Sequence, residues 1–361
     1  MTVLVNMMLG RGRGGLERAA ANYYHALAAR GYEVVTVGHS DGWLRTQVPR
    51  NSQFRPLSAF TEYDFRAQFL LSLFMREVEP AAVIAHGNRA MRYAGRLNGV
   101  MRIGVLHNLR FKSATRHLNA CIAVTHSLAA AARQRFPALA VEMVPNLVDV
   151  ISDGTRPGRR APIVIGALGR LHVDKGFDYL IEALADRRII ERDWRLIVAG
   201  EGPELTRLRA LATKKGLSGK VHFVGWVEDR SAFFRSIDIL CMPSRVEAFG
   251  LVLIEALAHA VPVIASDNSG SREIVVTERD ALVVPSSDPE ALAQALERLI
   301  DDPRFAESLG RRGWERVIAG YTLPVVAERL EKVVSKLIGG LAMGTPTAPE
   351  VDRHPKPAVP A

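Results

Sequence analysis

Cysteine is nearly absent from this sequence of 361 residues, which contains only Cys121 and Cys241. Each lies in an apolar run, ACIAV and IDILCMP, of the kind that forms a buried strand. Buried free thiols are therefore expected in place of a disulfide, and they fit the reducing interior of a cell.

Membrane-spanning and secretory signals are absent too. No apolar run reaches the ~18 residues that cross a bilayer. The first residues, MTVLVNMMLG, lack the basic and then apolar pattern of a secretory signal peptide. No Asp-x-Asp pair occurs, and no group of His, Cys and carboxylate residues has metal-site spacing. We therefore expect a cytoplasmic protein with no metal ion and no other tightly bound cofactor.

Acidic residues are scarce in the first half of the chain. Residues 1–155 contain 10 Asp and Glu against 18 Lys and Arg, whereas the remainder contains 28 against 29. Most of the net charge of +9 thus lies in the first half, which favours an anionic partner there. No basic helix with base-reading geometry is apparent, so nucleic acid is not expected. Anionic lipid headgroups or an acidic glycolipid fit better, and a merely solvated arginine-rich surface is the alternative.

The chain alternates between short β-rich runs and helical patterns, which predicts an α/β fold built from parallel βαβ units. Its length fits two domains. The polar stretch 152–161, rich in Gly, Pro and Arg, is the expected linker between residues 1–151 and 162–322. A last helix is expected over 323–340, and the Pro- and Ala-rich residues 341–361 are expected to be disordered.

The individual elements follow from the spacing of apolar residues. In the first domain, strands are expected at Val3–Asn6, Glu33–Val37, Ala82–Ala85, Arg102–Leu106, Ala120–Val124 and Val141–Val144, with a helix at Gly15–Arg30. In the second, strands are expected at Ile163–Ala167, Arg195–Ala199, Val221–Val224, Ile239–Met242, Pro262–Ala265 and Ala281–Val284. Helices are expected there at Gly176–Ala185, Pro203–Gly216, Arg230–Ser236, Phe249–His259, Pro289–Ile300 and Pro303–Ile318.

The segment with most chemical information is PSRVEAFGLVLIEALAHAVPVIAS, residues 243–266. Glu247 and Glu255 lie eight positions apart, on either side of the start of a predicted helix. The free amides of Phe249, Gly250 and Leu251 at that start can bind a diphosphate. A carboxylate inside the helix can accept hydrogen bonds from a ribose diol, and one before it can contact sugar hydroxyls. An incidental Glu255 is a poor explanation, because an unpartnered carboxylate in the apolar run LVLIEALA would be costly.

This segment resembles the E-x7-E signature of retaining glycosyltransferase family 4, whose members have the GT-B fold. The similarity covers roughly residues 1–338 and is densest over 162–285. It implies two Rossmann-like, doubly wound domains that face each other across a cleft, with a C-terminal helix that crosses back to the first domain. It also implies a nucleoside-diphosphate sugar as donor, bound by the second domain.

Further segments resemble the same family. In GRLHVDKG, residues 169–176, the resemblance assigns Arg170 and Lys175 to the donor diphosphate, whose charge both cations can neutralise as it leaves. Two ordinary surface cations are the alternative. VHFVGWV, residues 221–227, resembles the lining of the nucleobase pocket, with Val224 and Gly225 as candidates and Trp226 expected to pack. In LIVAGEGPE, the glycines Gly200 and Gly202 are expected to set a tight turn.

The segment GRGRGGLER, residues 10–18, permits two interpretations. Gly10, Gly12 and Gly15 form G-x-G-x-x-G, the dinucleotide fingerprint, which would indicate an NAD-dependent oxidoreductase. The acidic residue expected at the end of the second strand is not at the right position, however. The resemblance instead assigns Gly14 and Gly15 to a loop that faces the donor phosphates across the cleft, with Arg11 and Arg13 as candidates for contact with an anionic acceptor.

Single residues complete the expected site. The resemblance places His107, which follows the strand run MRIGVL, beside the donor sugar; a lone structural histidine is the alternative. Asn146 lies in VPNLVD, where the family's usual glycine is Leu147. In SDNSGSREIV, residues 266–275, Gly270 and Glu273 match the family pattern only in part, which leaves the acceptor-side contacts of this loop open.

The resemblance thus implies a retaining, metal-independent glycosyltransferase with His107, Arg170, Lys175 and Glu247 as catalytic residues. It would move a hexosyl unit from a UDP- or GDP-sugar to a cell-envelope glycan or glycolipid, such as a lipopolysaccharide or exopolysaccharide intermediate, at the inner face of the cytoplasmic membrane. Two other classes of function stay open: an NAD-binding oxidoreductase that uses the Gly10–Gly15 loop, and a non-catalytic GT-B protein that binds sugar nucleotides. An epimerase or phosphorylase on the same fold is a further alternative.

Overall fold

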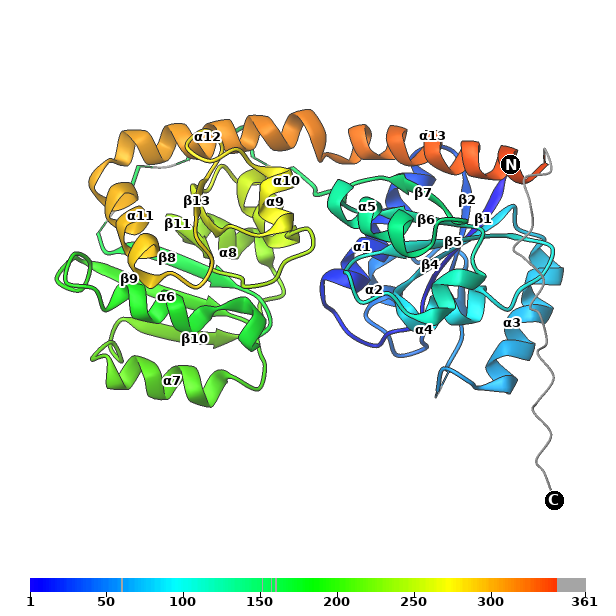
Figure 1. The fold of residues 1–361 in the computed structure, drawn as a ribbon, viewed down its shortest axis with the longest axis horizontal. Coiled ribbons are helices and arrows are strands. Elements are labelled where there is room, and N and C mark those ends of the chain that lie inside the picture. Colours follow the sequence, from blue (N-terminus) through cyan, green and yellow to red (C-terminus); the bar gives the residue numbers. More distant parts are fainter. Residues whose placement is uncertain (60, 151, 157, 160, 343–361) are drawn as a thin grey trace, which may run out of the picture.

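A computed structural model describes residues 1–59, 61–150, 152–156, 158–159 and 161–342. Two α/β units lie side by side, and the helices α12 (Pro303–Gly320) and α13 (Leu323–Ala342) run along one edge of both (Figure 1). Each unit contains one parallel sheet covered by helices.

The first sheet has the strand order β3-β2-β1-β4-β5-β6-β7, with every pair parallel. Because helices cover both of its faces, its central strands are almost continuously apolar. The strands are β1 (Val3–Met8), β2 (Glu33–Gly38), β3 (Phe54–Pro56), β4 (Ala82–His86), β5 (Met101–Leu106), β6 (Ala120–Ala123) and β7 (Ala140–Met143). The helices are α1 (Gly15–Ala28), α2 (Leu44–Gln47), α3 (Phe65–Val78), α4 (Gly87–Ala94) and α5 (His126–Arg135), with a 3₁₀ turn at Ser113–His117.

The second sheet has the order β10-β9-β8-β11-β12-β13 and is also parallel. Its strands are β8 (Ile163–Leu168), β9 (Trp194–Ala199), β10 (Val221–Gly225), β11 (Ile239–Met242), β12 (Val263–Ser266) and β13 (Leu282–Val284). Its helices, besides α12, are α6 (Phe177–Leu184), α7 (Leu205–Lys214), α8 (Arg230–Ser236), α9 (Leu251–Ala258), α10 (Ser269–Ile274) and α11 (Pro289–Asp301), with a 3₁₀ turn at Val173–Lys175. The doubly wound α/β architecture expected from the sequence is confirmed.

The predicted strands all form, within about two residues of their expected ends. The edge strand β3 was not predicted, because it has three residues, two of them exposed, and so carries no apolar alternation. Cys121 on β6 and Cys241 on β11 are buried free thiols, as expected.

The C-terminal helix crosses back to the first unit, as the resemblance implied. It packs on α1 and on the turn that follows α1, where Arg30 Nε donates to Glu331 Oε2 at 2.7 Å and the hydroxyls of Tyr32 and Ser335 are 2.9 Å apart. The helix runs to Ala342, so the first two residues of the tail expected to be disordered are helical; residues 343–361 lie outside the described residues. In the expected linker 152–161, the described residues form no helix or strand, and 157 and 160 lie outside the description, as does 151 at the end of the first expected domain.

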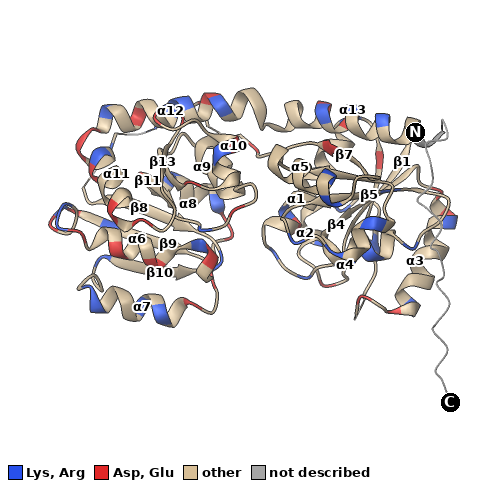
Figure 2. Ribbon diagram, in the orientation of Figure 1, with Lys and Arg blue, Asp and Glu red and all other residues tan. Residues whose placement is uncertain are grey.

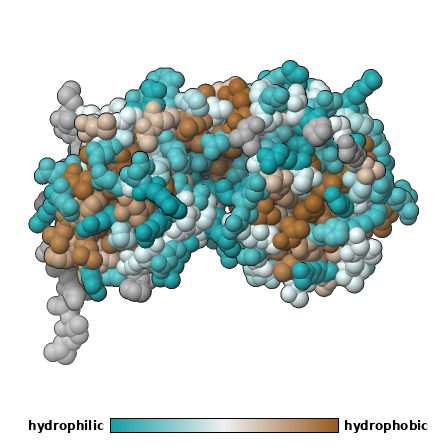
Figure 3. All heavy atoms as spheres, turned by 180° about the vertical axis from the view of Figure 1, so that it is seen from behind, coloured by the Kyte–Doolittle hydropathy of each residue, from teal (hydrophilic) through white to brown (hydrophobic). Residues whose placement is uncertain are grey.

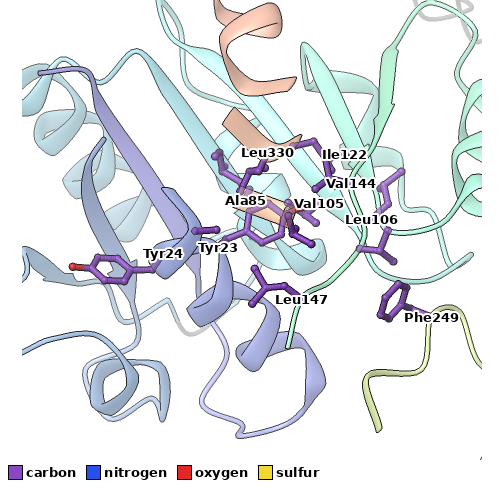
Figure 4. Packing of buried hydrophobic residues seen from close by; sticks show 14 of the residues in the cluster. Tyr23, Tyr24, Ala85, Val105, Leu106, Ile122, Val144, Leu147, Phe249 and Leu330 are labelled. Atoms are coloured by element: carbon purple, nitrogen blue, oxygen red, sulfur yellow. The ribbon is translucent and has the colours of Figure 1, made fainter. Parts of the chain in front are cut away.

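The core of the first unit extends into both α13 and the second unit. Tyr23 of α1 and Leu330 of α13 belong to one apolar cluster with β4, β5 and β6 (Figure 4). Phe249, from the second unit, is 4% exposed and belongs to the same cluster. The two units therefore share apolar contacts beside the cleft between them.

Candidate active site

A cavity of about 590 Å³ lies between the two units. In the second sheet the strand order reverses between β8 and β11, and in open α/β sheets ligands bind outside the carboxyl ends of strands at such a reversal. The cavity occupies that place and is closed from the other side by the start of α1. Nine of the predicted site residues line it: Gly14, Gly15, His107, Arg170, Lys175, Glu247, Phe249, Gly250 and Leu251.

Lys175 and Glu247 form an ion pair in the lining of the cavity. Lys175 Nζ donates to Glu247 Oε2 at 2.5 Å, and both side chains are mostly buried, at 27% and 19% exposed. The loops that carry them approach closely because Gly176, at φ +64°, has no side chain; a Cβ there would collide with the carbonyl oxygen of Pro243. Arg170 has no ion-pair partner among the described residues, so its guanidinium is available to an anion.

The helix α9 begins beside this pair. Gly250, at φ +99°, caps it in the left-handed conformation, so the helix starts at Leu251, two residues later than predicted. The first-turn amides of a helix have no acceptor within the helix and attract negative charge. Together with Arg170 and Lys175 they form a site suited to a diphosphate.

Glu255, one turn into α9, is paired with an arginine that the sequence did not reveal. Arg230 Nη2, from the start of α8, lies 2.6 Å from Glu255 Oε2, and each side chain is 13% exposed. Burial raises the pKa of Glu255, whereas Arg230 and Arg18 of α1 lower it. The Nε atoms of Arg18 and Arg230 are buried without a hydrogen-bond partner among the described residues. Glu255 does not line the cavity itself; Arg230 does.

The candidates for base recognition lie at the end of β10. Val224 is 49% exposed and Gly225 adopts φ +73°, and neither lines the cavity. The next residue does: Trp226, expected only to pack, lines the cavity and lies under the guanidinium of Arg13, 4.6 Å from its ring centre. This contact joins the two units across the cleft.

The glycine-rich loop before α1 encloses a carboxylate of its own. The buried Glu17 accepts a hydrogen bond from the Gly14 amide at 3.1 Å. Its Oε1 lies only 2.6 Å and 3.0 Å from where Cβ atoms would stand on Gly10 and Gly12. These glycines therefore make room for Glu17, whose carboxylate already accepts from the Gly14 amide that a dinucleotide phosphate would otherwise contact. The NAD interpretation of Gly10–Gly15 is not favoured for this reason. Gly15 has a different role, since a Cβ there would lie 3.2 Å from Leu251 of the other unit.

His107 follows β5 and lines the cavity. Burial lowers its pKa to about 4, so its imidazole is neutral at physiological pH. Its Nε2 lies 3.3 Å from Nδ1 of His86, a fully buried residue at the end of β4. Sequence reasoning missed His86, although its place at the end of a strand was a usable signal.

The structure shows the contacts of Asn146 and Glu273, which the sequence left open. Asn146 is 4% exposed and lines the cavity, and its Oδ1 is buried with no hydrogen-bond partner among the described residues. Glu273 accepts hydrogen bonds from the amides of His126 and Ser127, both at 2.6 Å. These amides begin α5, so Glu273 joins the second unit to a helix of the first. Gly270 is packed against the backbone of Phe249.

The turn glycines and the first-domain arginines can also be placed. A Cβ on Gly200 would collide with the carbonyl of Gly169, and one on Gly202 with that of Leu171, in agreement with a structural role. A second cavity of about 550 Å³ lies in the first unit near the ends of β1 and β4 and includes Arg11, Leu16, His86 and Arg89. Leu16 lines both cavities.

Neither a metal site nor a membrane-spanning helix is found in the described part of the chain. Those residues contain no cluster of three or more His, Cys, Asp or Glu side chains arranged to hold a metal ion. Their helices include none with the length and apolar character to span a bilayer.

Two family models match the chain, one in each half. Residues 13–151 match Glycosyltransferase Family 4, and residues 157–316 match Glycosyl transferases group 1. The chain belongs to the group 1, family 4 type of GT-B glycosyltransferases. Both sheets and the cleft cavity of this glycosyltransferase fall within the matched ranges, apart from the first residues of the N-terminal sheet.

Curated relatives and solved structures resemble this glycosyltransferase over between about half and nearly all of its length. The lipopolysaccharide core biosynthesis glycosyltransferase LpsE of Rhizobium meliloti is 28% identical over 90% of this chain and 96% of its own. The lipopolysaccharide core biosynthesis mannosyltransferase LpcC of Rhizobium leguminosarum is 32% identical over 51% of this chain and 53% of its own. HepE of Anabaena, crystallised with UDP and glucose, superposes with a TM-score of 0.81 over 93% of this chain and 100% of its own, at 16% identity, which shows the shared fold.

Proposed function

We propose that this glycosyltransferase transfers a hexosyl unit from a UDP- or GDP-sugar to a cell-envelope glycan or glycolipid, with retention of configuration and without a metal ion. The observation that carries the proposal is the convergence of three features on one cavity. These are the Lys175–Glu247 pair, the start of α9 and Arg170, which has no ion-pair partner among the residues that the structure describes. All three can stabilise a diphosphate as negative charge develops on it.

In the proposed step, the bond between the sugar C1 and the diphosphate oxygen breaks, and its electron pair stays on the diphosphate. The acceptor hydroxyl attacks C1 from the same face and gives its proton to the departing phosphate oxygen. Lys175, Arg170 and the α9 amides hold the diphosphate, whereas Glu247 and His107 orient the sugar. Glu247 is already bonded to Lys175, which favours a hydrogen-bonding role over that of a covalent nucleophile.

Donor binding is proposed to displace an internal contact. Glu255 is the carboxylate proposed to bind the ribose hydroxyls, and Arg230 occupies it in this structure. When a ribose takes the place of Arg230, the guanidinium of Arg230 can turn to the diphosphate in the adjoining cavity, which it already lines. Gly14 and Gly15 would approach the donor phosphates from the other unit, and Val224 and Gly225 would border the base.

The proposed acceptor class rests on the relatives and on charge. Several of the relatives carry names from lipopolysaccharide core biosynthesis, and a neighbour of similar fold is described as the lipopolysaccharide outer core galactosyltransferase WaaB. In this chain, Arg11 and Arg89 line the cavity of the first unit and have no ion-pair partner among the described residues. Two such cations suit an acceptor with phosphate or carboxylate groups.

We further propose peripheral binding to an anionic membrane through α3. Large apolar side chains on one stripe of this helix are exposed: Phe65 (81%), Phe69 (63%), Leu70 and Leu73. Arginines lie on α3 itself and on α4 (Figure 2). The view from behind shows apolar surface on this side of the first unit (Figure 3). An apolar stripe with flanking arginines suits the interface of an anionic bilayer.

Thermal stabilisation by UDP, GDP, ADP and NAD, measured in parallel, tests the proposed donor. A ligand at a hundredfold excess over its dissociation constant adds about 2.7 kcal/mol of stability. We expect UDP or GDP to do so, with the effect lost in Glu255→Gln and kept in the surface control Glu278→Gln. Stabilisation by NAD alone would overturn the proposal.

Turnover distinguishes an enzyme from a binding protein and tests metal independence. The protein is incubated with radiolabelled UDP-glucose, UDP-galactose or GDP-mannose and an envelope glycolipid extract, with and without EDTA. We expect transfer of label that EDTA leaves unchanged. Activity that EDTA abolishes and Mg²⁺ restores would contradict the metal-independent step, and nucleotide binding without transfer or donor hydrolysis would support a non-catalytic role.

A further inference from the structure

Three polar side chains form a buried row that leads from the first sheet to the cleft. Asn6 lies on β1, His86 ends the neighbouring strand β4, and His107 follows β5. His86 Nε2 lies 3.0 Å from Asn6 Oδ1, and His86 Nδ1 lies 3.3 Å from His107 Nε2. Asn6 and His86 are fully buried, His86 borders the cavity of the first unit, and His107 lines the cavity in the cleft.

The hydrogen-bond partners at the inner end determine where each proton lies. Asn6 Nδ2 donates to the carbonyl of Ala20 at 2.8 Å, so its Oδ1 is the acceptor that faces His86. His86 must therefore donate from Nε2. Burial holds the pKa of His86 well below its usual value, so the ring is neutral and its Nδ1 has a lone pair. That lone pair accepts a hydrogen bond from His107 Nε2–H.

We propose that Asn6 and His86 are positioning residues that hold His107 in the tautomer with its proton on Nε2, so that Nδ1 offers a lone pair to the cleft. The inference rests on the proposed function, in which His107 faces the donor sugar. A lone pair at this point selects a hydroxyl group and disfavours a phosphate oxygen, which is itself an acceptor. It also places no positive charge beside the sugar as C1 becomes electron-poor.

The surroundings of His86 contain few groups that would compete for its protons. The ring of Tyr23 on α1 packs edge-on at 4.8 Å between centres, and Arg11 and Arg89 line the cavity on which His86 borders. Besides burial, the neighbouring His107 is the group that lowers the pKa of His86. No carboxylate among the described residues bonds to either ring, so nothing in this row favours an imidazolium.

The tautomer can be read directly from the unliganded wild-type protein. In a two-bond ¹H–¹⁵N spectrum with labelled histidine, we expect His107 to have a protonated Nε2 and an unprotonated Nδ1 at pH 7. Assignment follows from His107→Gln and His86→Asn. A wild-type His107 protonated at Nδ1 overturns the inference, whether or not the protein has the proposed activity.

Variants at Asn6 and His86 test the consequence for catalysis. Asn6→Asp keeps the acceptor but adds a charge that favours protonation of His86, which would then donate from Nδ1 and force the His107 proton onto its own Nδ1. We expect the catalytic rate constant to fall on the order of 10²-fold with donor KM little changed. His86→Asn, whose amide oxygen can accept from His107 Nε2, should keep the tautomer and most of the activity.

Thr36→Val is the matched control. Thr36 pairs with Asn6 in the sheet register, is equally buried, and its hydroxyl has no hydrogen-bond partner among the described residues. In Thr36→Val we expect the His107 tautomer and the catalytic rate constant to equal those of the wild type. If Asn6→Asp shifts the tautomer and leaves the rate unchanged, His107 does not act through Nδ1 and the inference fails. If no nucleotide binds to the wild type, the proposed function fails while the spectrum still decides the tautomer.

Discussion

At the scale of single residues, the site consists of charges that hold each other in place. Glu247 has Lys175 as its partner, and Glu255 has Arg230, so each buried carboxylate is compensated. The exposed Arg170 has no ion-pair partner within the described part of the chain and is available to a ligand. In this proposal a donor diphosphate would thus meet Arg170 and Lys175 already in place, whereas Arg230 would have to leave Glu255.

Lys175→Met is expected to lower the catalytic rate constant on the order of 10²-fold, because it removes one cation from the leaving group. It should also destabilise the protein by about 1–3 kcal/mol, since Glu247 is left partly buried without its partner. Steady-state kinetics and thermal unfolding measure the two effects. Lys214→Met, at an exposed lysine of α7, is the control, and a variant as active as that control would exclude Lys175 from the chemistry.

Residue identity could be predicted where the signal is local, and not where it depends on the fold. Lys175 and Glu247 follow strands within short motifs, so both were named from the sequence. Arg230 was not, because its partner Glu255 lies 25 positions away and only the sheet brings them together. Gly10 and Gly12 were recognised as a pattern, but the reason for it, the buried Glu17, became visible only in three dimensions.

At the scale of elements, Glu273 connects α10 to the start of α5. Burial alone would raise the pKa of Glu273, but the hydrogen bonds from Ser127 and His126 outweigh it and lower the pKa. Because the folded-state pKa is depressed, this stabilisation is complete above the ordinary pKa of a glutamate. It is lost as the pH falls through the lower folded-state value.

Glu273→Gln is expected to destabilise the contact between the two units by about 1–2 kcal/mol, because a charge at the start of α5 is lost. Calorimetry should show a lower first transition or a separation of two transitions. Glu278→Gln, at a surface ion pair with Arg298, controls for the loss of one charge. Equal unfolding curves for both variants would show that Glu273 does not hold the units together.

Helices and strands could be predicted where the sequence marks both their ends and a single apolar face. Apart from the edge strand β3, the strands of both sheets were found because parallel strands buried on two faces are continuous apolar runs. The helix α3 was not predicted, because its apolar residues lie on the exposed side as well as the buried one and show no single face. The exposed apolar residues that obscured the helical pattern of α3 are the same ones that motivate its proposed role at a membrane.

At the scale of the whole molecule, the basic first unit and the α3 stripe predict orientation on a bilayer. Phe65→Ser with Phe69→Ser should weaken binding to vesicles of mixed phosphatidylcholine and phosphatidylglycerol roughly tenfold at low salt, because two aromatic side chains no longer leave water. Vesicle co-sedimentation measures it, with Val246→Ser, an exposed apolar residue of the second unit, as control. Equal binding to neutral and anionic vesicles would remove the electrostatic part of the proposal.

The return of α13 to the first unit has a consequence for how the protein is made. Val326, Leu330 and Val334 complete an apolar core whose other side chains come largely from the first 150 residues. A ribosome synthesises the first unit early, and domains generally fold in the order of synthesis. This unit, however, must wait until the second unit and α13 have been synthesised before its core is closed. Until α13 emerges from the ribosome, a strip of α1 and its neighbours stays open, and a chaperone could bind there.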